Sequence, residues 1–148
     1  MDLPGRSALV DAPLDAGGLA REVADRSGGR AGAQVTFTGL VRADRVGALR
    51  VRALEFEAYP EMAAAELERI RVEAGRRHGL VACSVLHRLG AVAVGAPSVV
   101  VVAAAAHRAE AFQAAAWVMD EVKRRLPVWK RAVDGGGGRT WVDAQGPR

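Results

Sequence analysis

The stretch SVVVVAAAAHRAEAFQAAAWVMDEVKRRLPVWKR, residues 98–131, decides the fold that we expect of this chain. Residues 98–106 are apolar without alternation, which is typical of a central strand buried on both faces. Residues 107–126 repeat apolar side chains at helical spacing. Pro127 ends that helix, because proline has no N–H and disfavours helical geometry in the residue before it. The stretch therefore predicts a buried strand, an amphipathic helix and a rigid turn.

Two lysines lie in this stretch, Lys123 and Lys130, and they are the only lysines among 21 basic residues. Where arginine otherwise supplies positive charge, a retained lysine indicates lysine chemistry, because an ammonium can lose its proton on burial and then act as a base or nucleophile. Two surface lysines left by chance are the alternative.

On a helical projection Lys123 falls in the middle of an apolar stripe. The other members of the stripe are Arg108, Phe112, Ala116, Met119 and Leu126. The charges that fall elsewhere are expected to be solvated: Asp120, Glu121, Arg124 and Arg125. Lys123 must then either line a pocket or extend its stem to water. Lys130 follows in the loop after Pro127, so the two lysines could converge on one site.

Further strands and helices are expected on either side of this stretch. Apolar or alternating runs predict strands at 33–42, 49–59, 80–90, two segments within 91–106, and a short one after the flexible glycine run 135–138. We expect the first two, 33–42 and 49–59, to pair antiparallel. Helices are predicted at Leu19 to Arg26 and at 60–79, the second opening with Pro60 and stopping at Gly79. The apolar residues at helical spacing in the second are Met62, Leu67, Ile70 and Ala74.

Strands and helices are mixed without regular βαβ alternation, which predicts a single α+β domain with a mixed or antiparallel sheet and flanking helices. Residues 1–32 are expected to be an N-terminal extension, either packed on the domain or flexible to it. The domain itself is expected to cover residues 33–148.

Composition limits the possible functions. The start, MDLPGRSALVDAPLD, has acids where a secretory signal would need basic residues and a longer apolar core. No apolar run has the length of a membrane span, so we expect a cytoplasmic protein. A lone cysteine, Cys83, in an apolar run predicts a buried core residue and excludes a disulfide framework. Three scattered histidines lead us to expect no metal, and we assign no cofactor. The formal charge of +4 suits an anionic ligand or partner.

Six segments, in this order along the chain, resemble one known family. They are VTFTGLVR (35–42), LEFEAYPEM (54–62), LHRLGAVAVG (86–95), AHRAEAF (106–112), MDEVKRRLPVWKR (119–131) and RTWVDA (139–144). The family is that of the large, catalytic subunit of molybdopterin synthase, the MoaE family. One departure is Ala58, where the family often has a histidine before the Tyr-Pro pair.

The resemblance implies an α/β-hammerhead-like fold and a transferase of molybdenum cofactor biosynthesis. In that family a small ubiquitin-like, MoaD-like subunit carries sulfur as a thiocarboxylate on its C-terminal Gly-Gly and inserts this tail into the large subunit. Cyclic pyranopterin monophosphate receives two sulfurs and becomes the dithiolene of molybdopterin. The large subunits form a homodimer with one small subunit at each end, a heterotetramer.

Site residues follow from the same resemblance. It implies that Lys123 and Lys130 are catalytic. It assigns substrate binding to six further residues. Phe37 and Met119 are expected to form walls of the pocket, and the others are Arg42, His107, Arg108 and Arg139. Taken alone, Arg42 could be a solvated strand end and His107 a helix start without chemistry. The pair His87-Arg88 also matches the family, but we interpret it as structural.

The residues agree with this function independently. A sulfur transferase usually needs a catalytic cysteine, and a partner that delivers the sulfur removes that requirement. The tail and the substrate phosphate are both anionic, and two lysines can bind anions and move protons. The alternatives are a non-enzymatic anion- or RNA-binding α+β module and a degenerate scaffold subunit, although the retained lysines argue against the scaffold.

Arg108 and Lys123 lie on one stripe but are separated by about 22 Å of helix. If both serve one substrate, as the resemblance implies, the site is shared between two subunits.

Overall fold

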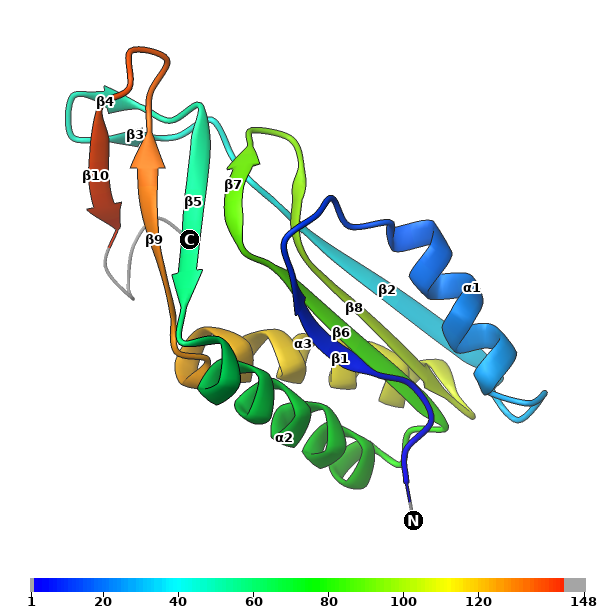
Figure 1. Ribbon diagram of the computed structural model, residues 1–148. Helices are drawn as coiled ribbons and strands as arrows, with labels where there is room; N and C mark the ends of the chain where they lie inside the picture. The colour runs from blue at the N-terminus through cyan, green and yellow to red at the C-terminus, as the bar shows by residue number, and fades with distance from the viewer. Residues whose placement is uncertain (1, 143–148) are drawn as a thin grey trace.

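The computed structural model describes residues 2–142 and has two four-stranded sheets as its frame (Figure 1). The first sheet has the order β1-β6-β8-β2 and is mixed, because β1 is parallel to β6 while the other pairs are antiparallel. Its strands are β1 (Ser7–Val10), β6 (Ala82–Arg88), β8 (Pro97–Ala105) and β2 (Ala33–Leu40). The expected α+β class with a mixed sheet and flanking helices is confirmed.

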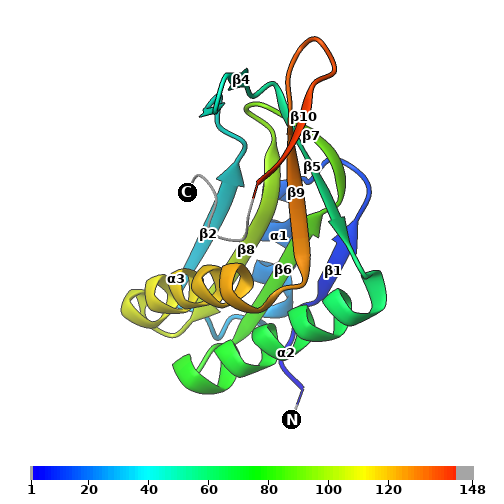
Figure 2. The same cartoon turned by 90° about the vertical axis from the view of Figure 1, so that its left-hand side faces the viewer.

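Strand β8 lies in the middle of this sheet and is apolar on both faces, as its sequence predicts. Val100, Val102 and Ala104 pack toward helix α1 (Ala16–Arg26), while Val101 and the residues that alternate with it pack toward the other two helices. Figures 1 and 2 show α1 on one side of the sheet and the other two helices together on the opposite side. The sheet is therefore the middle layer of three.

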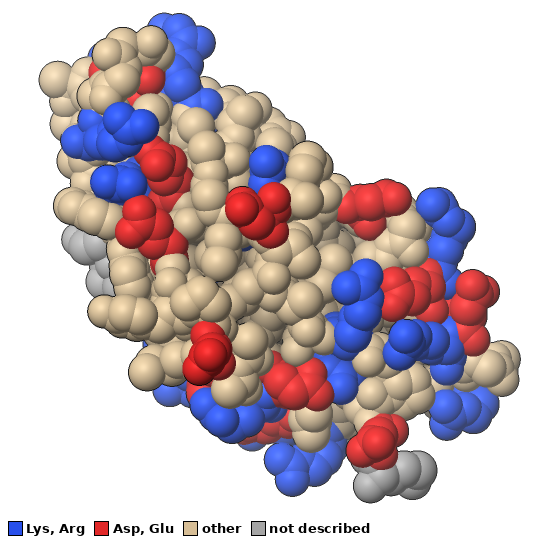
Figure 3. Space-filling model, in the orientation of Figure 1, with Lys and Arg blue, Asp and Glu red and all other residues tan. Residues whose placement is uncertain are grey.

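The second sheet is antiparallel throughout, with the order β10-β9-β5-β7. Its strands are β10 (Arg139–Val142), β9 (Val128–Val133), β5 (Ala53–Ala58) and β7 (Gly90–Ala93). A separate hairpin, β3 (Arg45–Val46) with β4 (Leu49–Arg50), connects the two sheets along the chain. Over β5, β9 and β10, basic and acidic side chains lie side by side on the surface (Figure 3).

Three expectations about these strands are wrong. The run 49–59 is not one strand, because the chain leaves the hairpin at Val51 and enters the second sheet at Arg52, whose N–H donates to the carbonyl of Val133 at 2.7 Å. Strand β2 does not pair with β5, because β2 lies along β8 in the first sheet. Lys130 also lies in strand β9, where a loop was expected.

Helix α2 (Pro60–His78) begins with Pro60 and ends at Gly79, whose φ of 61° is in the left-handed region that glycine tolerates. Leu67 and Ile70 are fully buried, as expected. Met62 is instead 60% exposed, because five residues turn a helix by about 140° away from Leu67. Ala63 takes the buried position in the first turn.

Helix α3 (Arg108–Arg125) forms as predicted but buries a different face from the one expected. The buried residues are Ala111, Ala114, Ala115, Val118, Glu121 and Val122. The predicted stripe lies beside that face. Phe112 is 62% exposed and Lys123 is exposed, Met119 is half-buried, and only Leu126 of the stripe is buried. Small alanines let the helix approach the sheet closely, and this packing outweighs the larger side chains of the stripe.

The expectation that Glu121 of this helix is a solvated charge is also wrong, because the residue is only 9% exposed. Its carboxylate pairs with Arg124 and with Arg125. Arg125 also reaches across to Glu66 and Glu73 of α2, at 2.7 and 2.8 Å. These ion pairs join the C-terminal half of α3 to α2 and fix the end of the helix from which Lys123 extends.

The first thirty residues contribute a strand and a helix to the fold. β1 pairs with β6, and α1 buries Leu19 and Val23 against the first sheet. The predicted helix ending at Arg26 is present and begins at Ala16, where the Asp15 carboxylate accepts the N–H of Gly18 at 2.9 Å. No helix within residues 2–142 has the length and apolar character needed to cross a membrane.

Candidate active site

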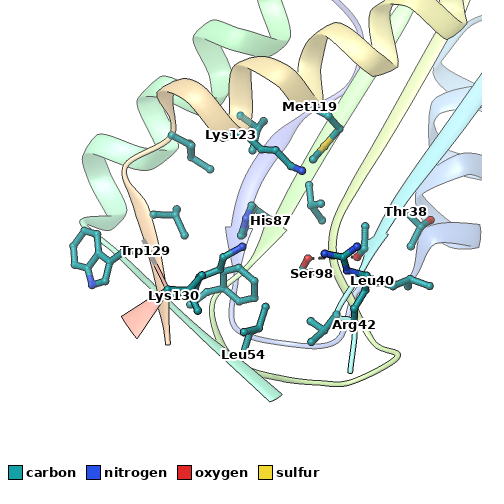
Figure 4. A pocket seen from close by; sticks show the side chains of 18 of the residues that line it. Thr38, Leu40, Arg42, Leu54, His87, Ser98, Met119, Lys123, Trp129 and Lys130 are labelled. Atoms are coloured by element: carbon teal, nitrogen blue, oxygen red, sulfur yellow. Dashed lines mark hydrogen bonds between the residues drawn. The ribbon is translucent and has the colours of Figure 1, made fainter. Parts of the chain in front are cut away.

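A cavity of about 590 Å³ lies between the two sheets, beneath the C-terminal half of α3 (Figure 4). One wall comes from β2 and the segment after it, and another from β5 and β9. The end of β6 and helix α3 complete it. Most of its lining is apolar, with basic groups contributed by Arg42, Lys123, Arg124 and Lys130.

Both lysines line this cavity, although they come from different elements. The helix ends at Leu126, whose extended backbone (φ −72°, ψ 123°) precedes Pro127, and the chain then enters β9. This turn lets Lys130 approach from the sheet while Lys123 extends into the cavity from the helix (Figure 4). The two groups that were expected to converge are therefore brought together, by a helix and a strand.

Arg42 lines the opposite side of the cavity, just after the end of β2. Its guanidinium lies 3.0 Å from the Asp44 carboxylate, and its side chain is 56% exposed. Phe37 and Met119 also line the cavity, as apolar wall residues. Five of the eight site residues proposed from the sequence thus lie around one space.

The other three do not line it. His107 and Arg108 lie at the N-terminal end of α3, where His107 is the N-cap residue and its side chain makes no capping hydrogen bond. Arg139 lies in β10 on the outer face of the second sheet, where its Nε donates to the Glu55 carboxylate at 2.6 Å. Within one subunit these three residues stand apart from the cavity that holds the lysines.

His87 lines the cavity, although the sequence was interpreted as giving it a structural role. It is 7% exposed and packs edge-on against Phe56, with ring centroids 5.3 Å apart. Its Nδ1 lies 2.9 Å from the carbonyl of Arg88. Burial lowers the pKa of His87 to about 4. The alternation of β6, which places His87 on the same face as Cys83 and Val85, was the signal that could have identified it.

Cys83 is fully buried in the core between the first sheet and helices α2 and α3, which confirms the expectation of a core residue. Burial raises the pKa of its thiol to about 12, although the nearby Arg71 partly offsets that effect. The thiolate is therefore disfavoured at neutral pH, and the cavity receives no sulfur nucleophile from it. Within residues 2–142 no group of three or more His, Cys, Asp or Glu side chains could hold a metal ion.

Cationic groups at opposite sides of an apolar cavity suit a flat organic molecule with a negatively charged substituent. Lys123 and Lys130 can bind an anion and exchange protons, Arg42 stays charged, and a buried neutral imidazole can accept a hydrogen bond.

The family model described as MoaE protein matches residues 9–125. The chain belongs to the MoaE family. Relatives named molybdopterin synthase catalytic subunit include one from Pyrococcus abyssi, 43% identical over 92% of this chain and 90% of the relative. Another, from Cereibacter sphaeroides, is 47% identical over 93% of this chain and 91% of the relative. These names do not support a non-enzymatic anion- or RNA-binding module. They place the chain among catalytic subunits that act in molybdenum cofactor biosynthesis.

Solved structures agree with this membership. The chain matches molybdopterin synthase from Staphylococcus aureus with a TM-score of 0.80 and 26% identity, over 92% of this chain and 96% of that one. It matches the molybdopterin cofactor biosynthesis protein E from Burkholderia multivorans with a TM-score of 0.80 and 32% identity, over 96% of this chain and 90% of that one. A chain from a Helicobacter pylori complex of subunits 1 and 2 of molybdopterin-converting factor shares the fold, with a TM-score of 0.77 at 20% identity, over 95% of this chain and 92% of that one.

Proposed function

We propose that this chain is a sulfurtransferase that converts cyclic pyranopterin monophosphate into molybdopterin. The observation that carries the proposal is the meeting of Lys123 and Lys130, the chain's only lysines, at one cavity with Arg42. In the proposed reaction the sulfur comes from the thiocarboxylated Gly-Gly tail of a small partner subunit. The complex of two subunits in the Helicobacter pylori structure supports such a partner.

The chemistry needs what the cavity supplies. In each transfer the thiocarboxylate sulfur bonds to a substrate carbon while a carbon–oxygen bond at that carbon breaks, and the oxygen leaves on the phosphate or as water. Water then cleaves the thioester that joins tail and substrate, so that the sulfur stays on the substrate and the tail leaves as a carboxylate. Negative charge therefore develops on the substrate and on the tail, close to the two ammonium groups. A lysine can also pass a proton to the oxygen released when the cyclic phosphate opens.

The remaining residues have binding roles in this proposal. Arg42 holds an anionic group at the side of the cavity away from Lys130, and Phe37 and Met119 enclose the apolar ring system. His107 and Arg108 lie at the far end of α3, and Arg139 lies on the outer face of the second sheet, so none of the three joins these groups within one subunit. We assign His107 and Arg108 to the site of the neighbouring subunit in a homodimer, the core of a heterotetramer with two small subunits.

The test is reconstitution. The purified chain is mixed with thiocarboxylated small subunit and cyclic pyranopterin monophosphate, and molybdopterin is measured by the fluorescence of its oxidised form. We expect product only when all three components are present, and little product with Lys123→Ala or Lys130→Ala. Absence of product with a wild-type chain that binds the thiocarboxylated subunit would overturn the proposed function.

A further inference from the structure

The hairpin β3-β4 carries two arginines that face each other. Arg45 and Arg50 are direct register partners across the two strands, and both are exposed. Like charges directly opposite each other destabilise a strand pair. The neighbouring acid, Asp44, is paired with Arg42, and within residues 2–142 no carboxylate forms an ion pair with Arg45 or Arg50. The arginine pair therefore does not stabilise the hairpin in the isolated subunit.

The segment that contains this hairpin is basic. Residues 42–52 contain four arginines and one aspartate, a formal charge of +3. The outer face of the second sheet is different, because there Arg131 pairs with Glu57 at 2.8 Å and Arg139 pairs with Glu55, and both signs of charge alternate (Figure 3). The exposed Arg45 and Arg50 therefore offer an acidic partner two cationic groups that are not already paired with carboxylates of the sheet.

The hairpin also forms part of the cavity wall. Asp44 and Val46 line the cavity, while Arg45 and Arg50 do not. A small molecule inside the cavity meets Arg42 and the lysines instead of the arginine pair. A macromolecule that inserts a chain end into the cavity must lie over its rim, close to this hairpin and its two exposed arginines.

We propose that Arg45 and Arg50 form a docking contact for acidic side chains on the body of the carrier protein whose tail enters the cavity. The inference rests on the proposed function, because it needs a carrier that delivers its tail to this site. Two adjacent guanidinium groups bind carboxylates through charge-assisted hydrogen bonds. An acidic partner also removes the repulsion between them, so the hairpin becomes more favourable in the complex than in the free subunit.

The experiment compares two double variants with equal changes in charge. In the first, Arg45→Gln and Arg50→Gln remove the arginine pair. In the control, Arg21→Gln and Arg30→Gln remove two exposed arginines of α1 and the turn after it, which pack on the other side of the first sheet. Binding of the small carrier protein with its intact Gly-Gly tail is measured by calorimetry at low and at moderate salt, and thermal unfolding of each free variant is recorded.

We expect the hairpin variant to bind the carrier at least tenfold more weakly at low salt, with a smaller difference at moderate salt. Its unfolding temperature should equal or exceed that of the wild type, because the like-charge pair is gone. The control should bind within twofold of the wild type. If the double variant does not fold, the single variants Arg45→Gln and Arg50→Gln are measured in the same way, each with an expected loss of at least threefold.

Three results would overturn the inference. Carrier binding by the hairpin variant within twofold of the wild type would show that the arginines do not touch the carrier. Equal weakening of cyclic pyranopterin monophosphate binding without carrier would show that the hairpin attracts the substrate instead. A wild-type chain that fails to bind the carrier would overturn the proposed function together with this inference. If the wild type binds the carrier and the hairpin variant binds it equally well, only this inference is overturned.

Discussion

Lys130 lies close enough to the buried imidazole of His87 for its positive charge to reinforce the effect of burial, and together they lower the pKa of His87 to about 4. The hydrogen bond between Nδ1 and the carbonyl of Arg88 opposes the shift but does not cancel it. Because a carbonyl only accepts, Nδ1 carries the proton of the neutral ring, and Nε2 is left as an acceptor. The imidazole can therefore stay beside an ammonium without adding a second positive charge to the cavity.

The lowered pKa of His87 predicts how the stability of the fold depends on pH. The pKa of His87 is lower in the folded state than the value near 6.5 expected when unfolded, so the unfolded chain binds more protons between about pH 6.5 and 4. Stability should be full above that window and should fall as the pH drops through it, by roughly 3 kcal/mol at most. The measurement is the urea unfolding free energy at pH 7 and pH 5, for the wild type and His87→Gln. An equal loss in both proteins would show that other groups cause it.

A second prediction concerns the two lysines. Lys123→Arg and Lys130→Arg keep the positive charge but remove the compact ammonium and its ability to give up a proton. We expect each variant to fold normally and to lose activity by roughly a hundredfold, the scale of general acid–base catalysis. Initial rates of molybdopterin formation, with circular dichroism as the check on folding, test this. Near-normal rates in both variants would mean that charge alone is required.

Much of the fold follows from local pattern. The apolar run of β8, the proline and glycine that bound α2, and Pro127 after α3 each specify an element through sterics or burial that acts within a few residues. Strand pairing depends on contacts between distant residues, and there the sequence was less informative. Both 33–42 and 49–59 are β-rich, yet they enter different sheets.

The site likewise contains features that follow from local pattern and features that depend on distant contacts. Two lysines seven residues apart could be expected to meet, because a helix end and a proline lie between them. The buried face of α3 could not be chosen correctly from hydrophobicity, because alanines that fit closely against the sheet outweigh the larger Phe112. His87 was missed for a related reason: its place at the cavity depends on the second sheet, through Phe56 and Lys130.

A third prediction tests whether the transferred sulfur comes from the partner or from a thiol of this chain. Cys83 is fully buried and its thiol pKa is raised to about 12, so Cys83→Ala should leave sulfur transfer intact and cost on the order of 1 kcal/mol of stability through lost packing. Thiol-alkylating reagents should likewise leave the native wild type active. Turnover and chemical unfolding are both measured. A folded Cys83→Ala protein that cannot transfer sulfur would show that the chain carries sulfur on its own thiol.

The last prediction is that the active site is shared between two subunits. Arg108 is the first residue of α3 and Lys123 lies two residues before its end, so about 22 Å of helix separates their backbones. Lys123 lines the cavity and Arg108 does not. One pterin phosphate cannot span that distance, so Arg108 can serve the reaction only in the cavity of a neighbouring subunit.

Complementation tests this arrangement. Arg108→Ala and Lys123→Ala proteins, each expected to be inactive, are mixed under conditions that allow subunit exchange. In a mixed dimer one site contains both defects and the other contains none. Random exchange makes half of the dimers mixed, each with one intact site, so we expect activity to return to about a quarter of the wild-type level. Exchange is followed independently with differently tagged chains. Complete exchange without any recovery would mean that each cavity is served by a single chain and that Arg108 acts elsewhere.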